Sequence, residues 1–213
     1  MRAAALWLSL LSAASLGCAS GKGSGPMPVV PTAGEDAASP GAARPTGRTF
    51  TLELLPPDSS IEAVATSLAG KHEAWIERFH GSVRFSLDDV SASRVNVDFD
   101  MTTLTMGLPG LTRAVRSPAF FDVQRYPRGV FASTKVERTS GKNTYRVTGT
   151  LELHGVTRPV SFEAVVVPGD GWATARGDVR LSRRDFGIVF DGPFDKLADD
   201  IIAVRIWAQG ATP

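Results

Sequence analysis

The fold is decided by residues 145–166, which read YRVTGTLELHGVTRPVSFEAVV. Before the His154-Gly155 pair, apolar side chains fall on odd positions, namely Tyr145, Val147, Leu151 and Leu153. After this pair they fall on even positions, namely Val160, Phe162, Ala164 and Val166. A period of two gives a strand one apolar face, and a short connection containing glycine joins antiparallel neighbours. The stretch therefore predicts a β-hairpin with one face in a core.

Alternation of the same kind extends in both directions from this hairpin. It recurs in residues 50–54, 83–87, 95–99, 130–136, 172–181 and 201–208. In residues 130–136 the alternating side chains are the even-numbered Val130, Ala132, Thr134 and Val136. Many short strands at regular spacing favour a barrel or sandwich over a parallel α/β sheet. We predict an all-β fold, namely an extended antiparallel β-barrel with one or two short helices between strands.

Residues 108–121 break the strand pattern. Pro109 and Pro118 stand where the first turn of a helix accepts proline, and no period of two persists. A short helix inserted among strands commonly lies across a barrel end or packs against the barrel wall, which would make it a candidate lid or gate. The alternative is a plain connector in which Phe120 and Phe121 fill core volume. The sequence leaves both interpretations open.

The N-terminus has the pattern of an export signal. Arg2 supplies a positive charge, and residues 3–16 are apolar but too few to span a bilayer. Gly17 precedes Cys18, which resembles the lipobox at which a lipoprotein signal is cleaved and the cysteine is acylated. The alternative is an ordinary signal peptide with an incidental cysteine. We expect residues 1–18 to be a signal peptide with a lipobox-like end, and the exported protein to be a periplasmic or outer-membrane-associated lipoprotein.

Residues 19–47 are rich in Gly, Ser, Pro, Ala and Thr and hold few large apolar side chains. Such a composition buries too little apolar surface to offset the entropy of ordering the chain. We predict a disordered tether here, followed by one domain in residues 48–213. With Cys18 acylated, the tether would hold this domain beside a membrane.

Charge and motifs argue against nucleic-acid binding and catalysis. The net charge is +1 and no block of Lys or Arg is present, so the electrostatic footprint of a DNA or RNA partner is missing. His72, His80 and His154 are scattered without metal-ligand spacing, and no nucleophile elbow, phosphate loop or dinucleotide fingerprint occurs. Asp98 and Asp100 share one face of a strand and are predicted to face solvent. We expect no catalytic residue, no metal and no cofactor, and therefore no enzyme.

Three segments of the chain have recognisable motifs. Residues 116–127 read RSPAFFDVQRYP, residues 153–160 read LHGVTRPV and residues 182–188 read SRRDFGI. These segments resemble the YceI-like family of polyisoprenoid-binding proteins. The resemblance implies a lipocalin-like barrel whose elongated interior holds an isoprenoid chain, often that of a quinone. The partners that it implies are an isoprenoid or other long-chain lipid and, through Cys18, the membrane.

Alternation then predicts which side chains hold the lipid. A long apolar chain needs a dry channel lined by branched and aromatic side chains. The predicted cavity lining is Val83, Phe85, Val95, Val97, Phe99, Leu151, Leu153, Phe162 and Ile206, with Phe120 and Phe121 near a gate. The predicted function is to bind a polyisoprenoid or isoprenoid quinone for transport or sequestration in the cell envelope.

The alternative function is an envelope interaction or stress-response module without a lipid ligand. Trp75, Trp172 and Trp207 would serve such a surface if they are exposed, although buried tryptophans are commoner. An elongated apolar cavity would favour lipid binding, whereas a packed interior would leave it without a site.

Two histidines keep two interpretations each. His154 either contacts a lipid head group or belongs to the turn, with its ring bonded to backbone and Gly155 at positive φ. His72 either corresponds to the histidine that one subgroup of the YceI-like family has in its second strand region, or is a structural histidine. The sequence favours the turn role for His154.

Overall fold

A computed structural model describes residues 48–67, 70–189 and 198–211. The signal peptide, Cys18 and the tether, all predicted within residues 1–47, lie outside the described residues. In the part of the chain that is described, the structure has eleven strands, one α-helix and three short 3-10 helices. The predicted all-β antiparallel fold is confirmed.

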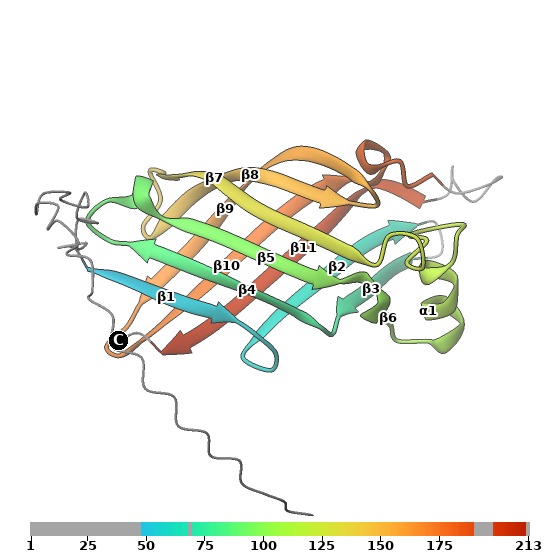
Figure 1. The fold of residues 1–213 in the computed structure, drawn as a ribbon, viewed down its shortest axis with the longest axis horizontal. Helices are drawn as coiled ribbons and strands as arrows, with labels where there is room; N and C mark the ends of the chain where they lie inside the picture. The colour runs from blue at the N-terminus through green and yellow to red at the C-terminus, as the bar shows by residue number, and fades with distance from the viewer. Residues whose placement is uncertain (1–47, 68–69, 190–197, 212–213) are drawn as a thin grey trace, which may run out of the picture. The chain divides into compact units, whose positions relative to one another are not determined.

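The strands form a single sheet in which every pairing is antiparallel. The sheet order is β1-β4-β5-β7-β8-β9-β10-β11-β2-β3-β6. The bounds are β1 Thr49–Leu54, β2 Ser59–Ser67, β3 Gly70–Ile76, β4 Phe79–Ser86, β5 Arg94–Asp100, β6 Leu104–Met106, β7 Arg128–Arg138, β8 Thr144–Leu153, β9 Val156–Pro168, β10 Trp172–Ser182 and β11 Ala198–Ala211. The sheet curls on itself, so that β1 at one edge lies beside β11 (Figure 1).

The β8–β9 hairpin has the predicted faces and a two-residue turn. His154 and Gly155 have φ of 53° and 72°. Positive φ at both central residues is typical of the type I′ turn, whose twist matches that of the flanking strands. Strand β9 begins at Val156, so Pro159 lies within the strand, opposite Thr150.

Strand β7 differs from the predicted alternation. Val136 is buried as expected, but in the first half of the strand the odd-numbered Gly129 and Phe131 are buried, and Val130 and Ala132 are only partly buried. The register with β8 shifts between Ser133 and Lys135. A β-bulge adds one residue to a strand and thereby exchanges its two faces. The even positions therefore point outward before the bulge and inward after it.

Strands β2 and β3 were not predicted. The sequence of β2 is SSIEAVATS, in which Ala63, Val64 and Ala65 run together and blur the period of two. Its position between β11 and β3 defines it as a strand. Long-range pairing here decides a structure that local pattern leaves ambiguous.

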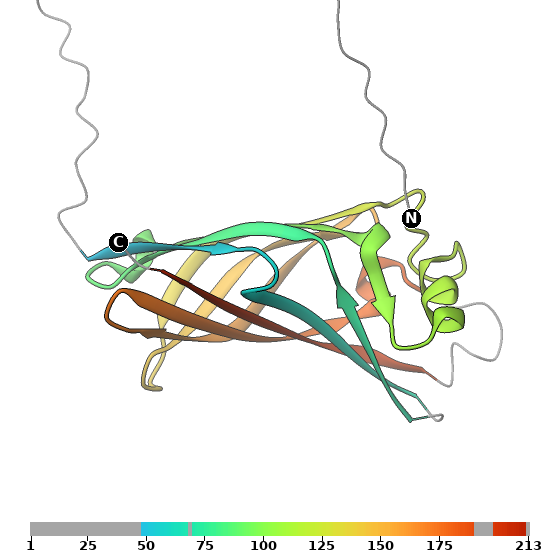
Figure 2. The same cartoon turned by 90° about the horizontal axis from the view of Figure 1, so that it is seen from below.

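The single α-helix, α1, spans Pro109–Arg116 and lies beside the three-residue edge strand β6 (Figure 2). Pro109 occupies its first turn, as predicted, because proline has no N–H to lose there. Residues 117–121 form turns, so Pro118 does not start a second helix.

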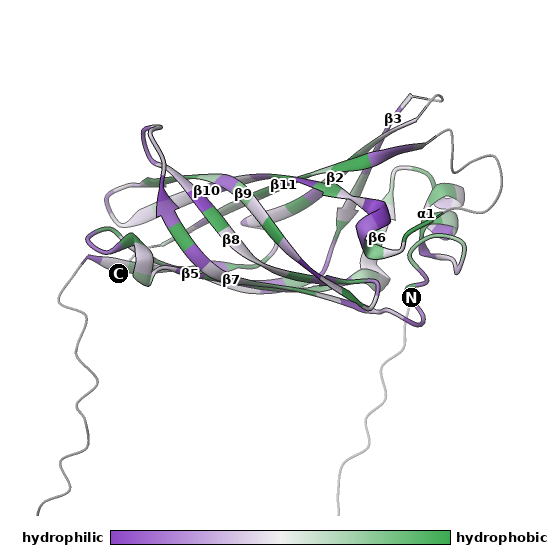
Figure 3. Ribbon diagram, turned by 90° about the horizontal axis from the view of Figure 1, so that it is seen from above, coloured by the Kyte–Doolittle hydropathy of each residue, from purple (hydrophilic) through white to green (hydrophobic). Residues whose placement is uncertain are grey.

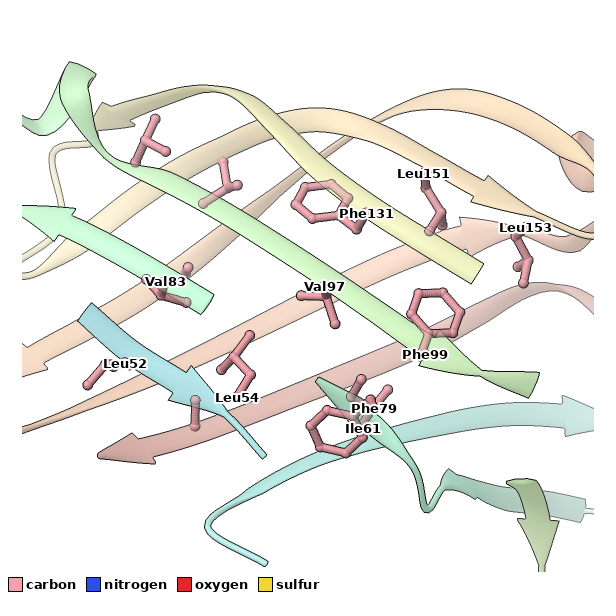
Figure 4. Close-up of a cluster of buried hydrophobic side chains, with 14 of the residues drawn as sticks. Leu52, Leu54, Ile61, Phe79, Val83, Val97, Phe99, Phe131, Leu151 and Leu153 are labelled. Carbon is pink, nitrogen blue, oxygen red and sulfur yellow. The ribbon is translucent and has the colours of Figure 1, made fainter. Parts of the chain in front are cut away.

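The inner face of the curled sheet is apolar. Hydrophobic and hydrophilic residues alternate along the strands (Figure 3). Side chains from β1, β5, β7 and β8, among them Leu54, Val97, Phe131 and Leu151, point toward one interior (Figure 4). The outer face carries cross-strand ion pairs such as Arg146–Glu163 and Arg205–Glu62.

Asp98 and Asp100 lie on the outer face and are engaged with arginines. Asp98 pairs with Arg128 across to β7. The Nη2 atom of Arg78 donates to one Asp100 oxygen at 2.7 Å, and the Thr102 amide donates to the other at 2.9 Å. Asp100 thereby caps the 3-10 helix η2, Met101–Thr103, which leads into β6 and α1.

Replacing Asp100 by Ala is expected to lower the free energy of unfolding by about 1 kcal/mol near neutral pH. The hydrogen bond from the Thr102 hydroxyl, followed by the interaction with Arg78, lowers the pKa of Asp100. The stabilisation is therefore present above the unfolded pKa of about 3.9 and is lost as pH falls through the lower folded pKa.

Urea denaturation across this pH range measures the effect. The difference between wild type and Asp100→Ala should narrow on acidification, and a difference that stays constant would contradict the assignment. The matched control is Asp178→Ala, because Asp178 makes an exposed ion pair with Arg176 of its own strand. Such pairs contribute little to stability.

Candidate functional site

The interior of the curled sheet contains an apolar cavity of about 170 Å³. Its lining comes from all eleven described strands, from the 3-10 helices that follow β5 and β10, and from a few residues between elements. The polar residues among the lining are Ser93, Tyr145, Arg176 and Arg183. A cavity of this composition offers contact area to an apolar molecule and few hydrogen bonds to a polar one.

Most of the residues predicted to hold a lipid line this cavity. They are Val83, Phe85, Val95, Val97, Phe99, Phe121, Leu151, Leu153, Phe162 and Ile206. Phe120 is the exception and does not line it. The Phe120 amide bonds to the Ser117 carbonyl, whereas the Phe121 amide bonds to the Val115 carbonyl. Neighbouring side chains in this turn point in different directions, so only Phe121 reaches the interior. Whether the lining residues bind lipid stays a prediction.

Aromatic rings close the barrel at the end where β1 begins. The ring centroids of Phe50 and Phe85 are 5.5 Å apart, and those of Phe85 and Tyr145 are 4.8 Å apart in an edge-to-face arrangement. All three side chains are buried. The Arg138 guanidinium lies 5.2 Å from the centre of the Tyr145 ring. This stack fills the interior at that end with packed aromatic rings.

The opposite end is covered by α1, which is held much more loosely. No residue of α1 is buried, although Val115 packs against the core. The Thr112 hydroxyl bonds to the Met106 backbone at 2.9 and 3.0 Å, and the Arg116 Nε donates to the Leu104 carbonyl at 2.5 Å. Leu104 also lines the cavity. A segment held by a few hydrogen bonds to an edge strand opens at a smaller free-energy cost than a packed core does.

Three phenylalanines that line the cavity cover glycines on neighbouring strands. Phe99 of β5 lies over Gly129 of β7, directly opposite in the register. In the same way Phe131 lies over Gly149, and Phe162 over Gly177. A ring placed on bare backbone occupies less of the interior than a ring that points across it. Glycine therefore shapes the cavity wall, because any Cβ at Gly129 would overlap the Phe99 ring.

Arg183 is a buried cation beside this apolar interior. Its side chain is 1% exposed, and its guanidinium lies 2.9 Å from Asp200. It also donates to the carbonyls of Ile188 at 3.0 Å and Asp199 at 3.2 Å. A buried guanidinium is tolerated only when its donors are satisfied. Arg183 therefore ties the 3-10 helix η3, Arg183–Phe186, to the start of β11.

His154 and His72 both have structural partners. The His154 Nδ1 lies 3.1 Å from the Phe186 carbonyl, which can only accept, so this nitrogen donates. The Tyr126 ring lies 4.3 Å from the His154 ring, centre to centre. His72 Nε2 lies 3.0 Å from the Ser67 hydroxyl. These contacts support the turn role that the sequence favours for His154.

Three tryptophans are exposed, against the expectation that they are buried. Trp75 is 37%, Trp172 46% and Trp207 43% exposed. Trp207 stands across from Arg176 on β10, which stands across from Val165 on β9. Val165 and Val167 are exposed too. Val165, Val167, Trp172 and Trp207 make up an apolar patch on the outer face of β9, β10 and β11, whereas Trp75 lies on β3.

The described ranges hold neither a cluster of metal-ligating side chains nor a helix that could span a membrane. Among residues 48–67, 70–189 and 198–211, no group of His, Cys, Asp and Glu is placed to hold a metal ion. The one α-helix in these ranges is too short and too polar to cross a bilayer.

The profile of the YceI-like domain matches residues 53–209. This chain belongs to the YceI-like family. It is 35% identical over 135 residues to a UPF0312 protein of Azotobacter vinelandii, an alignment that covers 60% of this chain and 69% of that protein. A UPF0312 protein of Vibrio parahaemolyticus is 37% identical over 116 residues, covering 52% of this chain and 61% of its own.

Solved structures share the fold of this YceI-like domain. BcnA of Burkholderia cenocepacia superposes with a TM-score of 0.67 at 21% identity, over 71% of this chain and 96% of BcnA. A polyisoprenoid binding domain from Saccharophagus degradans, implicated in plant cell wall breakdown, superposes with a TM-score of 0.59 at 13% identity, over 77% of this chain and 98% of that one. The residues that the structure describes all belong to one compact unit, and 96% of the BcnA chain superposes on it.

Family motifs located some site residues, and others carried no readable signal. The SRRDFGI motif contains Arg183, but its burial and its bond to Asp199 follow only from the fold. Phe131 was missed because the bulge in β7 reverses the face of the strand. Gly129, Gly149 and Gly177 were missed because a glycine in a strand does not show which ring covers it.

A double-mutant cycle tests whether the Phe99 ring packs on Gly129. Gly129→Ala is expected to lower the free energy of unfolding by about 1–3 kcal/mol, because the added methyl group displaces the Phe99 ring. In a Phe99→Leu background the same change should cost much less. Denaturant unfolding of the four proteins gives the coupling.

Gly110→Ala is the control, because a Cβ there meets nothing within 4 Å. It should stabilise the protein slightly, since alanine is the better helix former. Additive effects of Gly129→Ala and Phe99→Leu would refute the packing of this ring on this glycine.

Proposed function

We propose that this domain binds a long apolar lipid, a polyisoprenoid or an isoprenoid quinone, within the barrel and carries or sequesters it in the cell envelope. The observation that supports this is the apolar cavity, whose lining extends from Tyr145 near the closed end to Leu104 and Phe121 beside α1. The relative from Saccharophagus degradans, which shares the fold, is a polyisoprenoid binding domain. The proposal involves no chemical step and no cofactor.

The cavity is narrow for a long chain. Its volume of about 170 Å³ is below the roughly 300–1,000 Å³ of typical ligand pockets. A chain of several isoprene units would therefore have to displace lining side chains as it enters. Phenylalanine rings that rest on glycine backbone can swing without moving a strand, because no Cβ holds them in place. The lining thus offers a way to widen without breaking the sheet.

Energetics favour exchange over permanent storage. Removing a five-carbon isoprene unit from water releases about 4 kcal/mol, at about 0.8 kcal/mol per carbon group. The tail of such a lipid normally resides in a bilayer, which is as apolar as this cavity. Net transfer from bilayer to protein is therefore close to zero after ordering costs. A protein of this kind suits shuttling between membranes.

The N-terminal predictions complete the proposal. Export through residues 1–18 and acylation of Cys18 would place the domain beside a membrane that contains isoprenoid lipids. A tether raises the effective concentration of the site near its ligand without any new contact. We propose a periplasmic or outer-membrane-associated location on this basis.

A second candidate function has an observation in its favour. The exposed patch of Val165, Val167, Trp172 and Trp207 has the aromatic composition of protein-binding surfaces. An envelope interaction module would use this outer face and need no cavity. Ligand analysis separates the two functions.

Native mass spectrometry with organic extraction tests the proposed function. The domain, residues 48–213, is purified without detergent from a bacterial periplasm and then incubated with vesicles that contain a prenyl quinone. We expect a bound prenyl lipid. Protein that stays empty in both states would reject lipid binding and favour the interaction module.

A matched pair of variants locates the ligand. Ala175 lines the cavity, whereas Ala132 does not. Ala175→Leu adds volume inside and should lower occupancy about tenfold, because overfilling costs about 1–3 kcal/mol. Ala132→Leu adds the same volume elsewhere and should leave occupancy unchanged. Equal losses in both variants would argue against the cavity as the site.

A further inference from the structure

The α1 end of the barrel presents large apolar side chains to solvent. Leu108, the residue before α1, is 62% exposed, and Leu111 in its first turn is 38% exposed. Val115, one turn after Leu111 on the same face of the helix, packs against the core. Leu108 and Leu111 themselves are neither part of the buried core nor packed against it. Exposed apolar side chains gathered on one short segment are typical of a contact surface.

Positive charge accompanies these leucines. Arg113 and Arg116 lie in the last turn of α1, and residues 101–121 contain no Asp or Glu. Arg116 donates to the Leu104 carbonyl, which leaves its charge uncompensated by that contact. A short amphipathic helix with Leu111 on one face and Arg113 on the opposite face matches segments that lie in the interface of an anionic membrane.

Other apolar side chains lie at the same end of the barrel. Strand β11 begins at this end (Figures 1 and 2), and Ile201 near its start is 43% exposed. Val189, which follows η3, is 53% exposed. The nearby carboxylate of Asp200 is paired with Arg183 and Arg184, at 2.9 and 2.7 Å. The pairing reduces the repulsion that an anionic surface would meet there.

We propose that the α1 end docks on the surface of an anionic phospholipid bilayer, with Leu108 and Leu111 inserted among the head groups and Arg113 beside lipid phosphates. This docking adds a membrane-binding surface to the proposed function. It rests on the proposed function only in the claim that the lipid passes between bilayer and cavity at the α1 end. Leu104 and Phe121 flank α1 and line the cavity. Docking here brings the loosely covered end of the cavity to the acyl region, while the aromatic stack closes the far end.

The outer-face patch is the rival docking surface. Val165 is 40% and Val167 39% exposed, close to the 38% of Leu111. The cation within that patch, Arg176, is paired with Asp178. The patch therefore offers apolar area with compensated charge, whereas residues 101–121, which include α1, offer apolar area with positive charge and no carboxylate side chain. Only the α1 end should discriminate anionic from zwitterionic membranes.

Vesicle flotation of residues 48–213 tests the proposal, because this part lacks the predicted anchor and holds the whole sheet. Vesicles of phosphatidylcholine, with or without phosphatidylglycerol, are the probe. Wild type should float with the anionic vesicles and much less with the zwitterionic ones. Leu108→Asp/Leu111→Asp should reduce flotation at least about tenfold. Arg113→Gln should weaken it and reduce its salt dependence.

The matched control is Val165→Asp/Val167→Asp, which places two carboxylates on the rival patch. This control should float like wild type. Failure of wild type to bind anionic vesicles, or an equal loss in the control, overturns the proposal. Thermal unfolding shows whether each double variant is folded, and both double variants change exposed positions only. If Leu108→Asp/Leu111→Asp does not fold, Leu108→Gln/Leu111→Gln takes its place, with the same loss of flotation expected.

Loading from micelles separates this proposal from the proposed function. The Leu108→Asp/Leu111→Asp variant retains the cavity, so it should take up a prenyl quinone from detergent micelles as wild type does. Uptake from micelles by wild type without any vesicle binding would reject docking and leave lipid binding intact. Vesicle binding by wild type without uptake from either source would reject lipid binding and leave docking intact.

Discussion

The pairing register of the curled sheet is the constraint on which the cavity depends. Side chains alternate between the two faces of a strand, so a slip of one residue would turn an apolar face to solvent and a charged face to the interior. The β8–β9 hairpin is pinned by its two-residue turn, where His154 and Gly155 both have positive φ. The bulge in β7 exchanges the two faces of the strand, so that Val136 points inward after the bulge as Phe131 does before it. Each device keeps the interior apolar.

The two ends of the barrel differ in how they are closed, and this difference gives the site a direction. Phe50, Phe85 and Tyr145 stack at the end where β1 begins. At the other end α1 rests on β6 through a few hydrogen bonds and buries none of its residues completely. A ligand that moves along the interior would therefore meet the smaller barrier at the α1 end. The exposed leucines and arginines are located at that same end.

The sequence predicted the strands that alternate cleanly, and most of the side chains that it placed in the lining do line the cavity. Tyr145 to Val166 could be interpreted from period alone, because a half-buried strand leaves a strong pattern. Strand β2 could not, since small and β-branched residues run together in Ala63 to Ala65. The reversed face of β7 could not either, because the bulge depends on pairing with β8. Local pattern holds no information about a partner strand.

Sequence predicted the composition of the site better than its shape. Phe99, Phe162 and Leu151 were identified as lining residues from alternation, and all three line the cavity. The glycines under the aromatic rings, and the carbonyls that satisfy Arg183, come from segments distant in the chain. Sequence could not predict which of Phe120 and Phe121 lines the cavity, because adjacent identical residues in a turn face different surroundings. A resemblance to family motifs locates such residues without giving their orientation.

The most direct test of lipid binding inside the barrel is photo-crosslinking with a prenyl quinone that carries a diazirine in its tail, followed by mass-spectrometric mapping of the adducts. Binding within the cavity predicts adducts on inward residues such as Phe131, Leu151 and Phe162, all of which line it. Adducts confined to the outer face, on Val165, Val167 or Trp207, would contradict binding within the barrel and assign the ligand to the exposed patch instead.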